Sequence, residues 1–390
     1  MIAGRLVWAL GFSQLAMWGI TFYMVAIVGE PIVRETGWSR TEVYGGFSAA
    51  LVVMGVVSGR IGRLIDRIGG RPVMTAGSCI GAAGCLILAA AHHLAVYYLG
   101  WIVLGLAMRM TLYDAAFAAL ARVGGPEARR PIAQITLLGG LASTVLWPIG
   151  QFLIQEAGWR WTLVAYAGIA LATIPLHLMI PAARYAFDPK PGAGTTAPRA
   201  DTPARIAIAG FLYGTMVTFT SALNSAMSAH MIAILTSLGL AAGVAVGIGT
   251  LRGIGQSASR GAEILFGRRL DPIALGVLAT AIMPVGFVIG LWSGASPAAG
   301  IAFALLYGAG NGLVTIVRGT QPLVLFDPAA YGQIVGRLIG PSFIVSALAP
   351  ALLAFLIERY GPASALYVST GAAMIVFASS LGLWLLFRRR

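Results

Sequence analysis

Residues 62–71 read Gly-Arg-Leu-Ile-Asp-Arg-Ile-Gly-Gly-Arg, a charged and glycine-punctuated stretch between two apolar runs at roughly 43–62 and 73–91. Each run supplies the about 20 residues that a helix needs to cross a bilayer. Because charged groups avoid the hydrocarbon core, the stretch predicts a loop in water or among lipid headgroups. Two crossings precede this loop, so the N-terminus is expected on the same side of the membrane.

The composition indicates a membrane protein. Hydrophobic residues make up 58% of the 390 residues and charged residues only 10%, whereas a soluble domain carries about 25% charged residues. The formal net charge of +13 would suggest a nucleic-acid partner in a soluble protein. Here the arginines cluster between apolar runs and Lys190 is the only lysine. We therefore interpret the charge as a topology signal, and expect a lipid bilayer rather than nucleic acid as partner.

The apolar runs define the expected architecture. A stretch rich in Pro, Gly and Thr follows the sixth run and predicts a cytoplasmic linker at 183–205. The predicted fold is an all-α membrane protein of twelve transmembrane helices in two six-helix pseudo-repeats, at 1–182 and 206–390. The twelve runs are 6–29, 43–62, 73–91, 96–121, 131–155, 161–181, 206–236, 241–265, 273–293, 298–323, 333–357 and 363–387.

Arginines outside these runs are distributed unevenly. If successive loops alternate between the two sides, one side holds only Arg34, Arg40, Arg160 and Arg359, and the other side holds most of the rest. By the positive-inside rule, both the N-terminus and the C-terminus are predicted to be cytoplasmic.

The two halves also resemble each other in spacing. Gly105–Leu120 matches Gly308–Leu323 in length, and Pro148–Glu156 matches Pro350–Glu358. Repeated six-helix halves are typical of secondary transporters, whose substrate site is expected near mid-bilayer between the repeats.

Over nearly its full length the chain resembles the major facilitator superfamily. Residues 62–71 are similar to its signature between the second and third helices, and Gly267-Arg268-Arg269-Leu270-Asp271 resembles a degenerate echo of that signature. The resemblance implies a transporter rather than an enzyme, and a cytoplasmic latch formed by Asp66, Arg67 and Arg71. The alternative is that these charges only set the topology.

A second resemblance concerns the subfamily. Gly37-Trp38-Ser39-Arg40-Thr41-Glu42 is similar to bacterial relatives of the monocarboxylate and oxalate/formate carriers, which implies a bacterial inner-membrane location. Drug–proton antiporters of the superfamily usually carry Arg where this chain has Trp101, ahead of Gly105, and their helix 5 motif is absent. Both departures argue against that type of exporter.

Arginines inside apolar runs are candidate substrate ligands, because a charge at the centre of a membrane helix costs about 2.5–3.5 kcal/mol on insertion scales. Arg252 has no acidic neighbour three or four residues away, Gln256 shares its helix face, and the carriers it resembles use a cation in the same helix. Arg109 is either a substrate ligand or a structural or gating residue paired with Asp114. Arg260 and Glu263, three residues apart, predict an intrahelical pair or gate.

Asp114 is the first candidate proton carrier, because a buried carboxyl group can exchange a proton near neutral pH; a permanent counter-ion to an arginine is the alternative. Other polar and aromatic residues at similar depth are candidates to line the substrate path. They are Trp18, Tyr23 and Tyr113 in the first half and Asn224 and Asn311 in the second. Trp18 and Tyr23 also fit simple packing roles.

The leading prediction is a monomeric secondary transporter of a small organic anion, possibly a carboxylate, coupled to protons or to a second anion. One alternative is a copper importer that uses Met227, Met231 and His230, since thioethers and imidazole suit Cu(I). However, run 241–265 contains neither the His nor the Met that the copper-importing branch carries there. Another alternative is an exporter of drugs or other solutes. No nucleotide-binding loop or catalytic constellation is visible, so neither enzyme activity nor a cofactor is expected.

Overall fold

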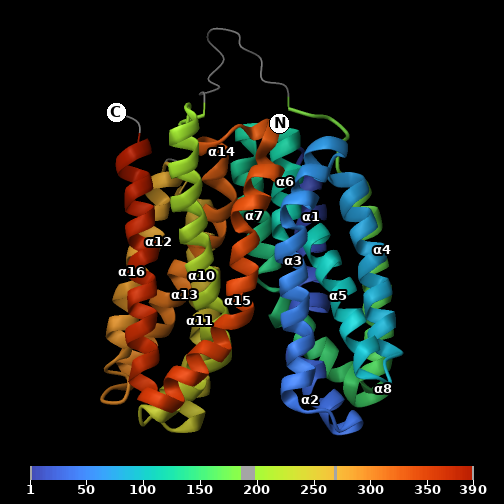
Figure 1. The fold of residues 1–390 in the computed structure, drawn as a ribbon, viewed down its shortest axis with the longest axis vertical. Coiled ribbons are helices and arrows are strands. Elements are labelled where there is room, and N and C mark those ends of the chain that lie inside the picture. The colour runs from blue at the N-terminus through green and yellow to red at the C-terminus, as the bar shows by residue number, and fades with distance from the viewer. Residues whose placement is uncertain (1, 186–197, 268–269, 389–390) are drawn as a thin grey trace. The chain divides into compact units, whose positions relative to one another are not determined.

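The computed structural model describes residues 2–185, 198–267 and 270–388, which form helices joined by short turns (Figure 1). η1 is a π-helical turn, and η2 and η4 are 3₁₀ turns. In chain order the elements are α1 (Gly4–Met17), η1 (Trp18–Phe22), α2 (Val25–Thr36), α3 (Arg40–Ile68), α4 (Gly70–Ala89), α5 (Leu94–Thr111), α6 (Tyr113–Gly124), η2 (Gly125–Ala128), α7 (Arg129–Gly139), α8 (Ala142–Ala172), α9 (Ile174–Leu178), α10 (Pro203–Ser237), α11 (Ala242–Phe266), α12 (Pro272–Gly290), α13 (Pro297–Thr320), α14 (Pro322–Leu325), η4 (Pro328–Ala330), α15 (Tyr331–Tyr360) and α16 (Pro362–Phe387).

The chain divides into two compact units. Unit 1 comprises Met1–Thr195 and Asp327–Gly340, and unit 2 comprises Thr196–Phe326 and Pro341–Arg390. Within unit 1, α3 and α4 pack on α5, and α4 also packs on α8. Within unit 2, α11 and α12 pack on α13, and α12 and α10 pack on α16, which runs beside α10 in Figure 1. The packing partners therefore follow a similar order in both units, as a repeated half would give.

Glycines matched between the halves have the same structural role. A Cβ on Gly105 of α5 would meet the backbone of Ala50 in α3, and a Cβ on Gly308 of α13 would meet the backbone of Arg252 in α11. Small residues allow membrane helices to approach this closely. The repeat in the sequence thus coincides with equivalent helix crossings, while the division into six and six helices stays a prediction.

The predicted loop at 62–71 is wrong in its conformation. α3 continues without interruption to Ile68, Gly69 alone leaves the helical conformation with φ 95° and ψ 163°, and α4 begins at Gly70. No residue between 63 and 68 breaks a helix, and a positive φ of this kind favours glycine. The charged side chains of this stretch therefore project from the last turns of α3 and the first turn of α4.

The runs 6–29 and 96–121 are also interrupted, contrary to expectation. Leu112 is extended, with φ −76° and ψ −175°, and separates α5 from α6. In the first run the π-helical turn η1 follows α1 directly, and α2 begins only at Val25. Neither break coincides with proline, so tertiary packing rather than local propensity decides them. Isolated π-helical turns occur frequently at functional sites.

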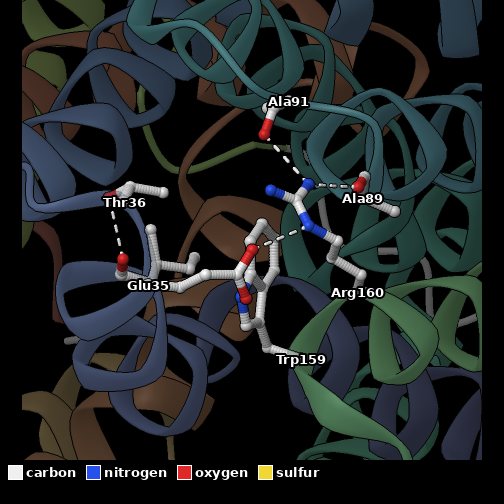
Figure 2. Close-up of polar contacts among 7 residues, drawn as sticks. Glu35, Thr36, Ala89, Ala91, Trp159 and Arg160 are labelled. Carbon is white, nitrogen blue, oxygen red and sulfur yellow. Dashed lines mark hydrogen bonds and ion pairs between the residues drawn. The ribbon is translucent and has the colours of Figure 1, made fainter.

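A cluster of polar contacts joins three helices at one end of unit 1 (Figure 2). The side chain of Arg160 in α8 donates to the Glu35 carboxylate at 3.0 Å and to the carbonyls of Ala89 and Ala91 at 2.7 and 2.9 Å. The indole of Trp159 donates to the other oxygen of Glu35 at 2.6 Å, and the Arg160 guanidinium lies over the Trp159 ring. This cluster ties the end of α2 to the end of α4.

Both described ends of the predicted linker are held by backbone hydrogen bonds. The Tyr185 amide donates to the Arg122 carbonyl at 2.7 Å in unit 1. In unit 2 the amides of Arg199 and Ala200 donate to the carbonyls of Val324 and Leu325. Lys190 and the remainder of 186–197 lie outside the described residues, as do Arg268 and Arg269 of the degenerate echo.

Many of the helices are long and apolar enough to cross a membrane. Within the described residues nine segments meet that criterion, and one of them, Leu94–Leu178, contains several helices separated by breaks. The protein is therefore an all-helical, multi-pass membrane protein over its described part. The number of twelve crossings and the cytoplasmic position of both termini stay predictions.

Candidate functional site

Arg252 lies on α11 in unit 2 with its guanidinium half-buried. Its Nη2 donates to Asn224 Oδ1 at 2.5 Å and to Ser228 Oγ at 3.0 Å, both on α10. The guanidinium also lies over the ring of Tyr307 on α13, 5.3 Å from the ring centroid. Among the described residues no carboxylate lies within ion-pair distance of Arg252. The positive charge is thus held by neutral oxygens and an aromatic face.

The amide of Asn224 is fixed from a third helix. Asn311 on α13, which is 7% exposed, donates from Nδ2 to the same Asn224 Oδ1 at 2.8 Å. Ser228 in turn donates to the Asn224 carbonyl at 2.6 Å. The predicted residues Arg252, Asn224 and Asn311 are therefore brought together. Ser228 was missed, although its position four residues after Asn224 places it on the same helix face.

Other predicted residues of unit 2 lie near the same helices. Gln256 follows Arg252 by one turn, and its backbone carbonyl lies against Gly312 of α13. Arg260 is buried, and its guanidinium donates to the Gly312 carbonyl at 3.4 Å and to Thr315 Oγ1 at 3.2 Å. Glu263 is also buried, at 9% exposure. Arg260 therefore links α11 to α13, and its role as a gate stays a prediction.

Arg109 lies in the interior of unit 1 at 2% exposure, in the last turn of α5. Its Nε donates to Ser58 Oγ at 2.8 Å and its Nη2 to the Ser58 carbonyl at 3.1 Å. A Cβ on Gly336 of α15 would lie 3.1 Å from the same Nη2. Asp114 lies beyond the break at Leu112, in the first turn of α6, so the two residues do not share one continuous helix.

Three predicted aromatic residues of unit 1 form one cluster. The Trp18 ring lies 4.9 Å from the Tyr113 ring and 5.7 Å from the Tyr23 ring, measured between centroids. The indole nitrogen of Trp18 is buried and has no hydrogen-bond partner among the described residues. Trp18 belongs to the π-helical turn η1, and Tyr113 follows the break at Leu112. The two backbone irregularities of unit 1 therefore meet at these rings.

Asp66 contacts the start of α15 within unit 1. Its carboxylate oxygens accept the backbone N–H groups of Gly332 at 2.9 Å and Gln333 at 2.7 Å. These amides belong to the first turn of α15, where N–H groups lack partners in the helix and the dipole favours a negative charge. Asp66 therefore caps a helix that is remote in sequence.

Arg71 and Arg122 donate hydrogen bonds to backbone carbonyls. Arg71 donates to the Ile180 carbonyl at 2.7 Å, whereas the side chain of Arg67 is exposed. Arg122, which was not among the predicted gate residues, donates to the Asp66 carbonyl at 3.2 Å and to the carbonyls of Ala182 and Ala183. The sequence offered no signal that would join Arg122 to this group.

The residues of the copper alternative are engaged in packing. Met227 and Met231 are 1% and 4% exposed, and a ring nitrogen of His230 bonds to the Pro350 carbonyl at 2.9 Å. Within the described residues no group of three or more His, Cys, Asp or Glu side chains is placed to hold a metal ion.

Comparison with known proteins decides the family. A sequence profile described as Major Facilitator Superfamily matches residues 8–317. The chain belongs to the Major Facilitator Superfamily. Members of this superfamily are transporters and not enzymes. The matched range includes Asp66, Arg109 and Arg252.

Solved structures of other transporters share the fold of this chain at low identity. The human organic anion transporter MFSD10 (TETRAN) has 16% identity and a TM-score of 0.77, with 96% of this chain and 99% of that chain covered. The proton:xylose symporter XylE has 11% identity and a TM-score of 0.75, with 98% and 95% covered. Multidrug resistance protein MdtL of Klebsiella pneumoniae subsp. pneumoniae is 27% identical over 165 residues, 42% of this chain. The match spans 41% of that relative's length.

Proposed function

We propose that this superfamily member is a secondary transporter of a small organic anion, and that Arg252 binds the negative charge of the substrate. The observation that carries the proposal is the half-buried Arg252 guanidinium, held by Asn224, Ser228 and Tyr307 with no carboxylate partner among the described residues. Hydrogen bonds that an arginine donates to neutral oxygens orient its guanidinium but do not neutralise the charge. In a membrane protein such a charge is costly unless an anion or water meets it.

The orientation of the guanidinium supports a carboxylate as the anionic group. Its contacts with Asn224 and Ser228 use Nη2, whereas a guanidinium carries five N–H donors in a planar fork. The Nε–H and Nη1–H groups remain to donate to the oxygens of an anionic group such as a carboxylate, and hydrogen bonds of this charged kind are strong. The stretch 37–42, similar to monocarboxylate and oxalate/formate carriers, supports the same substrate class.

Arg109 fits a structural role better than a substrate-binding one. It is 2% exposed, and its Nε and Nη2 donate to Ser58 of α3. We place it with Asp66 among the residues that hold the first turns of α15 within unit 1. Because α15 continues beyond Gly340 into residues assigned to unit 2, release of this segment is a suitable gating step for alternating access.

The proposal extends to the oligomeric state, the membrane, the coupled species and the substrate path. We place the protein as a monomer in the inner membrane of a bacterium, with protons or a second anion as the coupled species. Asp114 is the proton-carrier candidate that the sequence offers. Trp18, Tyr23 and Tyr113 are proposed to line the substrate path in unit 1.

The test begins with purified protein in detergent, screened by thermal shift against monocarboxylates, dicarboxylates, sugars, cations and drugs. The best anion is then assayed in proteoliposomes with the Arg252→Ala and Arg252→Lys variants. Arg252→Ala is expected to weaken binding at least about tenfold, because hydrogen bonds to a charged group contribute about 1.5–3 kcal/mol. Arg252→Lys retains part of the affinity, since it keeps the charge and loses the fork.

Arg359→Ala is the matched control, because Arg359 is an exposed arginine at the end of α15. It is expected to bind and transport like the unmodified protein. Full transport by a correctly folded Arg252→Ala variant would overturn the anion site, and so would a screen in which only neutral or cationic compounds bind.

A second candidate function is export of drugs. It is favoured by the 27% identity to MdtL over 165 residues and by the aromatic cluster around Trp18, because aromatic faces bind apolar and cationic compounds. Export predicts lower accumulation of a fluorescent cation in cells that express the protein, with loss of the effect in Trp18→Ala. Unchanged accumulation in expressing cells would remove this candidate. No observation favours copper import.

A further inference from the structure

A second buried polar cluster of unit 1 lies apart from the aromatic residues. His177 is the centre of this cluster, which we call the His177 joint and which comprises Ser13 of α1, Ser78 of α4, Thr173 at the end of α8 and His177 of α9. Ser13, Ser78 and His177 are 0% exposed and Thr173 is 2% exposed. The joint connects four helical elements through side chains alone, and no sequence motif singles it out.

Both ring nitrogens of His177 are hydrogen bonded. Nε2 lies 2.5 Å from Ser13 Oγ, and Nδ1 lies 3.0 Å from Ser78 Oγ. Ser78 Oγ also lies 2.7 Å from Thr173 Oγ1, which donates to the Ala170 carbonyl at 2.7 Å. Each hydroxyl carries a single proton and can therefore donate only one full hydrogen bond. The donor and acceptor roles of these groups thus depend on one another.

The donor and acceptor of each of these hydrogen bonds can be assigned by starting from the Thr173 hydroxyl. Thr173 uses its proton on the Ala170 carbonyl, so the Ser78 hydroxyl donates to Thr173, with the Met74 carbonyl as a longer second acceptor at 3.3 Å, and accepts from His177. Nδ1 therefore carries the proton of the neutral imidazole, and Nε2 accepts from Ser13. This is the arrangement in which every short contact of the joint is a hydrogen bond.

This hydrogen-bond arrangement does not accommodate a second proton on the His177 ring. Protonation of Nε2 would set its N–H against the hydroxyl proton of Ser13, which would then have to turn toward a carbonyl of its own helix. The ring would become a cation whose partners, hydroxyl groups and the Met74 backbone carbonyl, are all neutral. Burial of a charge without a charged partner is costly, so the closed joint favours the neutral ring.

The elements packed around the joint carry arginines and neutral titratable groups. Arg71 of α4 donates to the carbonyl of Ile180, about one turn beyond His177, and Arg5 lies about two turns before Ser13 on α1. The neutral titratable groups on the same helix faces are Cys85, two turns after Ser78, and Tyr166, two turns before Thr173. Cys79, next to Ser78, is exposed. Both charged groups in this set are positive, so neither offers a negative partner to a protonated His177.

We propose that His177 is a proton-binding site whose occupancy is tied to opening of the His177 joint. With the joint closed the ring is neutral; with the joint open the ring meets water and binds a proton in the range where histidine ordinarily titrates. Proton affinity then differs between two conformations, which is what couples an ion to a conformational change. The proton-binding site itself is argued from the structure of unit 1. Its role as the site of the coupled proton rests on the proposed transport function.

The position of Ser13 connects the joint to the aromatic cluster. The neighbouring Gln14 donates to the Thr111 carbonyl at 2.8 Å, at the last residue of α5. One turn further along the same helix, Trp18 begins the π-helical turn and contacts Tyr113. Release of Ser13 from His177 would therefore free the stretch of α1 that ends at the aromatic cluster.

The test uses the full-length protein in nanodiscs without any substrate, so its result does not depend on the identity of the anion. Histidine labelled with nitrogen-15 reports tautomer and protonation by NMR between pH 5 and pH 8, and His177→Gln assigns the signal. Hydrogen exchange of the α1 peptide 4–17 is followed over the same range. We expect the Nδ1–H tautomer at pH 8 and, on acidification, protonation together with faster exchange of α1, by up to about tenfold per pH unit beyond the intrinsic rate.

Two further variants test the coupling itself. Ser13→Ala removes the partner of Nε2, so α1 is expected to exchange faster already at pH 8, with the protonation step moved to higher pH. His92→Gln, at an exposed histidine, is the matched control and leaves the pH dependence of α1 exchange unchanged.

A ring that stays neutral from pH 8 to pH 5 would overturn the proposal. So would an acid-dependent exchange of α1 that persists in His177→Gln, since another group would then carry the proton; Asp114→Asn tests the sequence-derived candidate. If His177→Gln fails to fold, Ser13→Ala still decides, because unchanged α1 exchange and an unchanged His177 signal in that variant contradict the joint. Failure of the anion site in Arg252→Ala leaves all of these readouts intact.

Discussion

Gly62 of α3 and Gly332 of α15 lie against each other so closely that neither has room for a side chain. A Cβ on Gly62 would collide with the Gly332 carbonyl, and a Cβ on Gly332 would collide with the Gly62 carbonyl. One turn along α3, Asp66 accepts the Gly332 amide at 2.9 Å. The signature glycine and the signature aspartate therefore serve one contact: the glycine permits the approach and the carboxylate caps the helix that approaches.

The first prediction concerns this glycine pair. Gly62→Ala is expected to lower the free energy of unfolding by about 1–3 kcal/mol, because the opposing atoms are backbone and cannot rotate away. Gly168→Ala is the matched control, since a Cβ at Gly168 inside α8 meets nothing within 4 Å. Thermal unfolding of the purified variants measures both. Equal melting temperatures for the Gly62 and Gly168 variants would show that α3 and α15 do not approach in this way.

The second prediction separates the charge of Asp66 from its shape. Asp66→Asn keeps one acceptor oxygen but places an amide donor where the second oxygen accepts the Gln333 amide at 2.7 Å. Stability is expected to fall by about 1.5–3 kcal/mol, the usual contribution of hydrogen bonds to a charged group. Hydrogen exchange of the first turns of α15 should rise at the same time. Protection of these amides at the unmodified level would contradict the cap.

The third prediction concerns the positioning of Arg252. Asn224→Ala removes the oxygen that accepts from both Arg252 and Asn311. The guanidinium stays charged but loses its orientation, so anion binding is expected to weaken about five- to thirtyfold while the maximal rate changes little. Thr236→Ala, an exposed position on the same helix, serves as control. A variant with unaltered affinity would mean that Asn224 does not orient the anion ligand.

The fourth prediction compares two ion pairs at the same end of unit 1. Arg40 pairs with Glu30 at 2.8 Å, but the Arg40 side chain is 72% exposed, so Arg40→Ala should leave unfolding unchanged. The Arg160 side chain is 25% exposed and also binds the carbonyls of Ala89 and Ala91. Arg160→Ala should therefore destabilise unit 1 by about 1–2 kcal/mol. Similar melting temperatures for the two variants would show that the cluster in Figure 2 does not stabilise unit 1.

Hydrophobic runs predicted where most helices lie. The runs 206–236 and 363–387 differ from α10 and α16 by only a few residues at their ends. The charges in 62–71 predicted a loop, and this prediction is wrong because charged side chains can extend from a helix that leaves the membrane. The break at Leu112 had no local signal at all. Its extended backbone depends on packing of α5 and α6 against other helices.

The candidate site was predictable residue by residue but not as an arrangement. Arg252, Asn224 and Asn311 each stood out as a polar residue in an apolar run, because such residues need partners. That all three share one amide oxygen depends on how α10, α11 and α13 cross. Arg109 was expected either to bind substrate or to have a structural or gating role, and the sequence could not show that it donates to Ser58 inside unit 1.

What the sequence determined by itself is the helical membrane class and the superfamily, because hydrophobic length and a local signature are properties of consecutive residues. Which side chains meet was decided only by tertiary structure. His177 bonds to Ser13 across 164 positions of chain, and Asp66 caps Gly332 across 266. Such contacts arise where glycines let helices approach and where buried polar groups must find partners. The spacing of neighbouring residues in the sequence predicts neither condition.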